Sequence, residues 1–207
     1  VRHMGSKYPI FSFDFTGAKR GVLPASYDYL RLEGRMQYRL NLPPIGYSQL
    51  MLEGGKIFGK VPYLLLKLHE GNGTYFYDRY AFSCMNFYEF SSDAWISFFY
   101  EHHFNGFLLG RVPLLKKLNW REVFVFKGVY GTLSARNDGS LPNTKAVMLF
   151  PVGMSSVEHP YLETGFGIEN IFRLLRVDCI WRLTHHRAVP GLSIPTFTVN
   201  FSLNLKF

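Results

Sequence analysis

The chain has 207 residues, of which 47% are hydrophobic and 17% aromatic, and its formal net charge at pH 7 is +8. This length suits one domain, and so large an apolar fraction excludes wholesale disorder. Lys and Arg are scattered singly instead of forming a stripe, so we expect no nucleic-acid binding despite the charge. Cys84 and Cys179 show no metal-ligand spacing.

The first residues carry no structural signal. The chain opens on Val1, which indicates a processed product or a piece of something longer, and residues 1–7 could be a leader or tag remnant. No run approaches the roughly 18 apolar residues of a transmembrane helix. Strand character begins where Phe11, Phe13 and Phe15 alternate with polar residues.

The segment from Leu30 to Leu42 alternates without a fault, which predicts one long strand with two different faces. One face carries Leu30, Leu32, Gly34, Met36, Tyr38, Leu40 and Leu42. The other carries Arg31, Glu33, Arg35, Gln37, Arg39 and Asn41. The run is longer than the usual five or six residues of a globular strand and matches a tilted membrane strand with some overhang.

Further strands are predicted near 46–58, 81–90, 96–100, 121–134, 162–168 and 177–183. Residues 42–46 predict a stiff short turn and Asn105-Gly106 a tight hairpin. Longer polar segments lie at 60–80, 135–160 and 184–195. The total is about nine candidate strands, whereas a closed single-chain bacterial barrel has an even number, so one prediction is wrong or the barrel is incomplete.

The last segment repeats the strand pattern and ends on an aromatic residue. Its apolar face carries Phe197, Val199, Phe201, Leu203, Leu205 and Phe207. A terminal alternating strand with a final aromatic is typical of the sorting signature of outer-membrane barrels. We therefore expect this face to meet lipid. Charged residues on the polar faces, which are Arg31, Glu33, Arg35, Arg39, Arg176, Asp178 and Arg182, are expected to form a charged row in the barrel lumen.

Candidate chemistry is sparse. Adjacent histidines such as His102-His103 point to opposite faces of a strand, so we expect no metal site. A serine-histidine-acid site from Ser91, Ser92, Asp93 and His102 stays open, although no nucleophile elbow is present. The aromatic and polar segment with Asn72, Tyr75, Tyr77, Asp78 and Arg79 predicts either a surface loop for a ligand or a loop packed into the barrel mouth.

Several stretches resemble one family of large outer-membrane proteins. They are Gly54–Tyr63, His69–Gly73, Tyr77–Phe82, Met85–Phe90, Glu101–Phe107, Val112–Leu118, Pro160–Glu163, Gly167–Ile171 and Arg176–Asp178. That family pairs an N-terminal carboxypeptidase-regulatory-like domain with a C-terminal barrel, which is distantly similar to the surface-antigen and barrel-assembly superfamily. The resemblance implies an outer-membrane location, no cofactor and no peptidase activity. The chain departs from the family pattern by lacking the N-terminal domain and the earlier strands.

We therefore expect an all-β protein: an antiparallel transmembrane β-barrel of about 8 strands, or the C-terminal half of a larger one, formed by residues 1–207 as a single domain. We expect it in the outer membrane of a Gram-negative bacterium, as a scaffold, channel or assembly partner and not as an enzyme. The expected partners are the lipid bilayer, the barrel-assembly machinery through the C-terminal strand, and other outer-membrane or periplasmic proteins. The alternatives are an outer-membrane enzyme acting on lipid or peptidoglycan, and a soluble lipid-binding β-protein.

Overall fold

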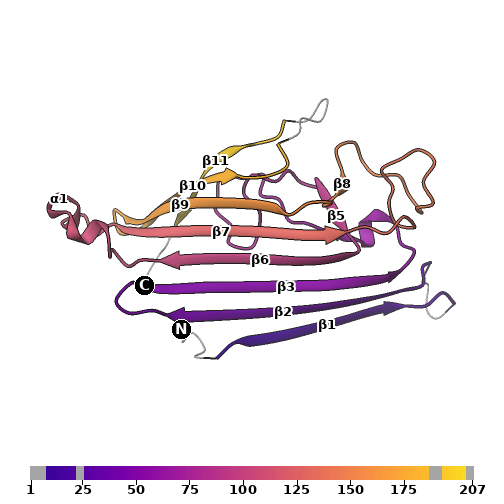
Figure 1. Cartoon of the computed structure of the whole chain (residues 1–207), viewed down its shortest axis with the longest axis horizontal. Helices are drawn as coiled ribbons and strands as arrows, with labels where there is room; N and C mark the ends of the chain where they lie inside the picture. The colour runs from indigo at the N-terminus through magenta and orange to yellow at the C-terminus, as the bar shows by residue number, and fades with distance from the viewer. Residues whose placement is uncertain (1–7, 22–25, 187–192, 204–207) are drawn as a thin grey trace.

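The computed structural model describes residues 8–21, 26–186 and 193–203, and one broad sheet dominates the fold (Figure 1). Eight strands follow one another in the order β1-β2-β3-β6-β7-β9-β10-β11, each antiparallel to its neighbours. The strands are β1 (Ile10–Ala18), β2 (Tyr29–Asn41), β3 (Tyr47–Gly59), β6 (Ala94–His103), β7 (Arg121–Thr132), β9 (Tyr161–Ile171), β10 (Leu175–Arg182) and β11 (Phe197–Leu203).

A second, small sheet contains β4 (Lys67–Leu68), β5 (Phe90–Ser92) and β8 (Ser155–Ser156). Its β5 and β8 are parallel, so the fold is not antiparallel throughout. Helical structure is confined to η1 (Tyr63–Leu65), η2 (Leu109–Arg111) and α1 (Pro113–Lys116). In the described part of the chain, no helix is both long and apolar enough to cross a lipid bilayer.

The expected all-β fold with an eight-stranded antiparallel sheet is confirmed, but two local predictions are wrong. Residues 81–90 form no strand of the large sheet. Side chains of that sheet bind the backbone of Ala81, Ser83 and Cys84, and the backbone of Phe82 pairs with residues 70 and 72 of the same connection. Asn105-Gly106 forms no tight hairpin: both residues have positive φ, and the chain then passes through η2 and α1 before β7. The turn at 42–46 does join β2 directly to β3, with Leu42 N donating to Gly46 O at 2.8 Å.

The sheet is open at both edges in the part of the chain that the structure describes. β1 pairs only with β2, and β11 pairs with β10, so no hydrogen-bonded ladder joins the two ends of the sheet into a barrel. The edge of β11 is partly covered by residues 75–77. Tyr77 N donates to Phe201 O, and Phe201 N donates to Tyr75 O, both at 2.7 Å.

The connections differ between the two ends of the sheet. At one end, called here the turn end, lie the links 42–46, 104–120 and 172–174. At the opposite, loop end lie the links 19–28, 60–93, 133–160 and 183–196. Residues 60–93 are called the crossing segment, because they return across one face of the sheet and contact β6, β7, β9 and β10. That face is called the inner face.

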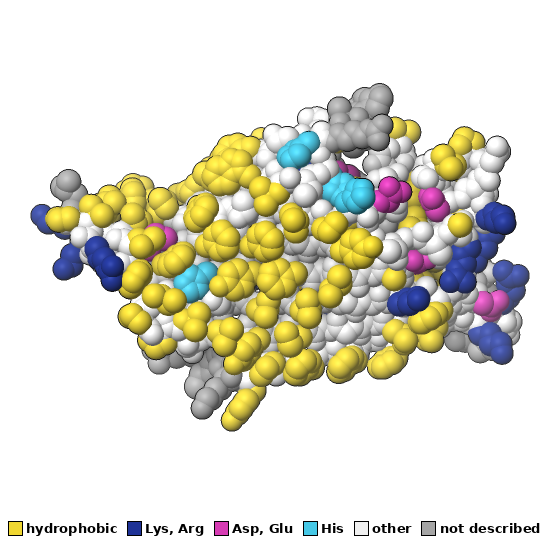
Figure 2. All heavy atoms as spheres, viewed as in Figure 1, with side chains coloured by type: hydrophobic (Ala, Val, Ile, Leu, Met, Phe, Trp, Pro, Cys, Tyr) yellow, Lys and Arg dark blue, Asp and Glu magenta, His cyan; other side chains and the backbone are white. Residues whose placement is uncertain are grey.

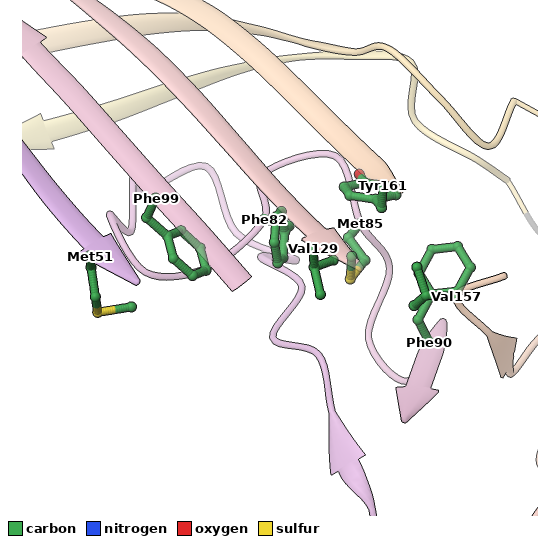
Figure 3. Close-up of a cluster of buried hydrophobic side chains, with 8 residues drawn as sticks. All are labelled: Met51, Phe82, Met85, Phe90, Phe99, Val129, Val157 and Tyr161. Atoms are coloured by element: carbon green, nitrogen blue, oxygen red, sulfur yellow. The ribbon is translucent and has the colours of Figure 1, made fainter. Parts of the chain in front are cut away.

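The apolar core lies between the inner face and the crossing segment (Figure 3). It consists of Met51, Phe82, Met85, Phe90, Phe99, Val129, Val157 and Tyr161. Phe82 of the crossing segment stands between two rings of the sheet, 5.1 Å from Phe99 and 5.3 Å from Tyr161 between ring centroids. A second cluster, Ile57, Val61, Leu66 and Trp95, packs the start of the crossing segment onto β3 and β6. The crossing segment is therefore part of the core.

Candidate functional site

The outer face of the sheet is apolar from one edge to the other. The register places on it the exposed side chains of Phe11, Phe13, Phe15, Leu30, Leu40, Phe58, Ile96, Tyr130, Phe166, Trp181, Phe197, Phe201 and Leu203. Figure 2 shows hydrophobic side chains across the strands, with Lys and Arg gathered toward the two ends. The charged outer residues within the described strands are Lys56 and Glu122, each near one end of its strand. An exposed apolar surface of this size is typical of a face that contacts a membrane or another protein.

The residues predicted for the apolar face of the terminal strand lie on the outer face of the sheet as far as Leu203, the last described residue. Phe197, Val199, Phe201 and Leu203 share the outer face of β11, whereas Asn200 is buried on the inner face. Leu205 and Phe207 lie outside the described residues.

The inner face is charged, and it is buried over β6, β7, β9 and β10 but exposed or half-buried at β1 and β2. The structure places all seven residues of the predicted charged row on it: Arg31, Glu33, Arg35, Arg39, Arg176, Asp178 and Arg182. Four of the five arginines reach a carboxylate. Arg31 binds Glu33 at 2.6 Å and Arg35 binds Glu53 at 2.8 Å. Arg176 binds Asp178 at 2.8 Å, and Arg182 binds Glu89 at 2.5 Å. Arg39 does not, and it lies instead over the Tyr47 ring, 3.9 Å from its centroid. The acceptors Glu53 and Glu89 were not predicted.

Glu101 of β6 is the centre of one charged cluster and is only 1% exposed. Its carboxylate accepts Arg79 Nε at 2.6 Å and Arg176 at 3.0 Å, and the Tyr77 hydroxyl also donates to it. Two of the predicted loop residues, Tyr77 and Arg79, are therefore turned toward the sheet. Burial and the Glu101 charge together raise the pKa of the Tyr77 hydroxyl well above its ordinary value.

The other predicted loop residues lie further out. Tyr75 is exposed, and the Asn72 side chain binds within its own turn, through Thr74 and Phe76. The Asp78 carboxylate accepts Tyr80 N at 2.8 Å, while the Asp78 carbonyl points to Lys127. The structure thus divides this segment: one part is exposed at the sheet edge and the other is packed inside.

Two opposite charges on the inner face hold the backbone of the crossing segment. Lys127 of β7 is fully buried, and its ammonium donates to the carbonyls of Asp78 at 2.8 Å and Ala81 at 2.6 Å. Glu163 of β9, directly across from Lys127, accepts the N–H groups of Ser83 at 2.8 Å and Cys84 at 2.7 Å. Backbone groups buried away from water need such partners. The two side chains therefore supply hydrogen-bond partners to the backbone of this segment, as a neighbouring strand does in a sheet.

Arg182 of β10 holds the following part of the same segment. Its guanidinium donates to the Cys84 carbonyl at 3.1 Å and to Glu89 at 2.5 Å, and it lies 4.8 Å from the Tyr161 ring centroid. Burial raises the pKa of the Cys84 thiol to about 12, so this thiol stays protonated and unreactive. Both described cysteines are free thiols.

His69 and Lys67 attach the start of the crossing segment. Lys67 binds Glu53 of β3 at 2.6 Å, and His69 Nε2 lies 2.9 Å from the Ser92 hydroxyl. Burial, with Lys67 nearby, lowers the pKa of His69 to about 3, so this imidazole is neutral at physiological pH. Because Ser92 is completely buried, its hydroxyl has no access to a substrate.

The serine-histidine-acid site considered from the sequence does not assemble. Asp93 binds Asn137 and the Ser134 backbone, whereas His102 lies at the far end of β6 on the outer face. Nine residues of extended chain place it about 30 Å away. His102 instead binds Ser48, with Nδ1 2.8 Å from the hydroxyl and Nε2 3.0 Å from the Ile45 carbonyl. Ser48 is only 1% exposed, so this pair is a satisfied buried hydrogen bond and not an accessible nucleophile.

His103 points the opposite way from His102, as the alternation predicts. Its ring stacks on Tyr47 with centroids 4.5 Å apart, and its Nδ1 is 3.2 Å from Glu169. Over the ranges that the structure describes, no three His, Cys, Asp or Glu side chains are placed to hold a metal ion.

Comparison with known proteins identifies the chain at the level of a family. No curated protein matches it. The model of the C-terminal domain of a family of unknown function (DUF5686) matches residues 2–135, which include β1 to β7 and the whole crossing segment. The match covers more than half of the 207 residues. The chain therefore belongs to this family, as a copy of its C-terminal domain.

Proposed function

We propose that this domain forms part of the wall of a bacterial outer-membrane β-barrel whose interior is filled by the crossing segment, and that it works as a scaffold or assembly partner. One observation carries the proposal: the apolar face of the sheet is exposed, and the charged face is buried where the crossing segment covers it, over β6, β7, β9 and β10. A soluble β-sandwich has the opposite arrangement, with its apolar faces packed together and its polar faces in water. In a membrane barrel, apolar side chains face lipid and polar side chains face the lumen.

Strand length supports the same proposal. β2 and β3 have 13 residues each. At about 3.3 Å per residue such a strand is about 43 Å long, and a tilt of about 45° reduces its height to about 30 Å, the thickness of the hydrocarbon layer. The charged outer residues Lys56 and Glu122 then lie near opposite borders of that layer.

The open edges favour a larger barrel over a closed one of eight strands. Lipid offers no hydrogen-bond partner for the backbone of an edge strand, so a spanning sheet must close. β1 and β11 are both without a neighbour that would close the sheet in the described chain. We infer that strands beyond these residues complete the wall, as in the family with an N-terminal regulatory-like domain and a surface-antigen-like barrel. The barrel-assembly machinery would then recognise the C-terminal strand.

The buried contacts favour a filled lumen over a channel. Lys127 and Glu163 bind the backbone of Asp78, Ala81, Ser83 and Cys84, and removing the segment would leave the buried Lys127 ammonium without its two carbonyl acceptors. An enzyme is not proposed, because Ser48 and Ser92, which each contact a histidine, are both buried.

The test compares two single arginine substitutions on the full-length protein in its native host. Leu52→Arg places a charge on the outer face near the middle of β3, where it costs about 2–4 kcal/mol in a bilayer. Gln37→Arg, the matched control, places the same charge on the inner face of β2. We expect Leu52→Arg to lose detergent-extractable, heat-modifiable protein from the outer-membrane fraction, while Gln37→Arg keeps it. Equal membrane assembly of the two variants would mean that the outer face does not contact lipid.

A further inference from the structure

A basic cavity of about 640 Å³ opens at the turn end of the inner face. It lies between the turn after β2, the end of β6, the start of β7 and the crossing segment. Charged side chains that line it are Arg39, Arg79, Arg121, Arg176, His103 and Glu169. It is called the rim cavity.

Most of these charges already have a partner. Arg79 and Arg176 both bind Glu101, and Arg176 also binds Asp178. Glu169 is contacted by His103 at 3.2 Å. Arg121 lies across from Glu169 in the strand register, yet no carboxylate within the described ranges comes within 4 Å of Arg121 or Arg39. Neither guanidinium group therefore forms an ion pair with a carboxylate of the described chain, although the Glu169 charge lies near Arg121.

Arg39 is nevertheless held in place. Its guanidinium lies over the Tyr47 ring at 3.9 Å, and Tyr47 stacks on His103, which is fixed in turn by Glu169. Stacking on an aromatic ring restrains an arginine without using its N–H groups. The N–H groups of Arg39 thus remain available at the cavity.

We propose that the rim cavity binds a phosphate-bearing anion between Arg39 and Arg121. Guanidinium groups bind phosphate oxygens with two parallel, charge-assisted hydrogen bonds. A phosphate dianion matches two unpaired arginines in charge. Its tetrahedral oxygens can also accept from neutral donors in the same lining, which include Asn41, Asn105 and Ser202. Tyr77 and Arg79 of the crossing segment line the cavity, so the site requires that segment to be docked, but it does not depend on what the outer face contacts.

The experiment measures inorganic phosphate binding to the full-length protein in nanodiscs of neutral lipid, at low and constant ionic strength, by ³¹P NMR titration. We expect saturable binding that Arg39→Gln and Arg121→Gln each weaken about tenfold or more, as loss of a charge-assisted contact predicts. Arg31→Gln is the matched control, because Arg31 lies on the same face of β2 but is paired with Glu33 and lies outside the cavity. Its binding should equal that of the wild type.

Two results would overturn the proposal: no saturable phosphate binding by the wild-type protein, or equal binding by wild type, Arg39→Gln and Arg121→Gln. Heat-modifiable migration of each variant shows that the barrel has assembled. A second titration separates the sources of phosphate. If soluble short-chain phosphatidic acid displaces inorganic phosphate, the site accepts a lipid headgroup; if it does not, the site takes only small soluble phosphates.

Discussion

Replacing the carboxylate of Glu163 tests most directly how the crossing segment is held on the inner face. In Glu163→Gln one carboxylate oxygen becomes an NH₂ group, which cannot accept a hydrogen bond. In the wild type one oxygen accepts Ser83 N at 2.8 Å, and the other accepts Cys84 N at 2.7 Å and the Tyr161 hydroxyl at 2.6 Å. Whichever way the amide turns, at least one buried N–H group then faces another donor.

The expected cost follows from these contacts. A buried donor left unsatisfied costs about 1–3 kcal/mol. The positive charge of Lys127 also loses the favourable effect of the Glu163 charge across from it, although the two groups form no ion pair within 4 Å. We therefore expect Glu163→Gln to destabilise the docked crossing segment by about 3 kcal/mol, which raises the amide exchange rate of residues 78–84 about a hundredfold.

Hydrogen exchange with mass spectrometry on the full-length protein in detergent measures this effect directly. Glu158→Gln is the matched control, because Glu158 is exposed and lies just before β9. The double variant Lys127→Met/Glu163→Gln should cost less than the sum of its single changes, since it leaves no unpaired charge. Unchanged exchange at residues 78–84 in Glu163→Gln would refute the view that Glu163 holds this segment.

Three further predictions test other contacts. Phe82→Ala removes a ring packed between Phe99 and Tyr161, and should lower the free energy of unfolding by about 3–5 kcal/mol in a denaturant titration, whereas exposed Phe87→Ala should change it little. His69 has a folded-state pKa of about 3 against an ordinary 6.5, so the unfolded chain binds more protons between these values, and stability falls as pH drops below 6.5 and levels off near 3. The slope attributable to His69 is about 1.4 kcal/mol per pH unit, and thermal unfolding of His69→Gln against pH should lack it; a slope identical to that of the wild type would contradict the prediction. Cys84 should resist a maleimide in the folded protein and react after unfolding, because it is completely buried and its thiol pKa is raised to about 12; labelling of the native protein at the rate of an exposed thiol would contradict this.

The alternation of residues predicts the sheet well because it reports a local property. Leu30 to Leu42 was predicted as one strand, and β2 runs from Tyr29 to Asn41. The two faces of β2 and β11 also follow the prediction, since parity along a strand fixes which side chains share a face. Because Arg31 and Leu32 are adjacent in β2, alternation alone places Arg31 on the inner face and Leu32 on the outer face.

The alternation of residues does not predict how the crossing segment packs on the inner face. Residues 81–90 have the composition of a strand, yet the backbone groups of Ala81, Ser83 and Cys84 bind Lys127 and Glu163, single charged side chains in other strands. A signal was available: Lys127 shares its face of β7 with Val123, Val125 and Val129, and a lone charge among valines needs a buried partner. The sequence does not say which carbonyls supply it. Similarly, its position in the alternation places Glu101 on the inner face. The alternation does not predict that Tyr77, Arg79 and Arg176 contact its carboxylate.

The way the crossing segment is held sets the order in which the domain can fold. The segment is synthesised before β6, but the groups that bind it arrive later: Glu163 follows Ser83 by 80 residues, and Arg182 follows Cys84 by 98. Contacts so distant along the chain form late and slowly. Until β9 and β10 are in place, the N–H groups of Ser83 and Cys84 and the Cys84 carbonyl lack the side chains that bind them in the folded domain. Docking of the crossing segment is therefore completed only when β9 and β10 are in place, and a chain that stops before β9 would lack both Glu163 and Arg182.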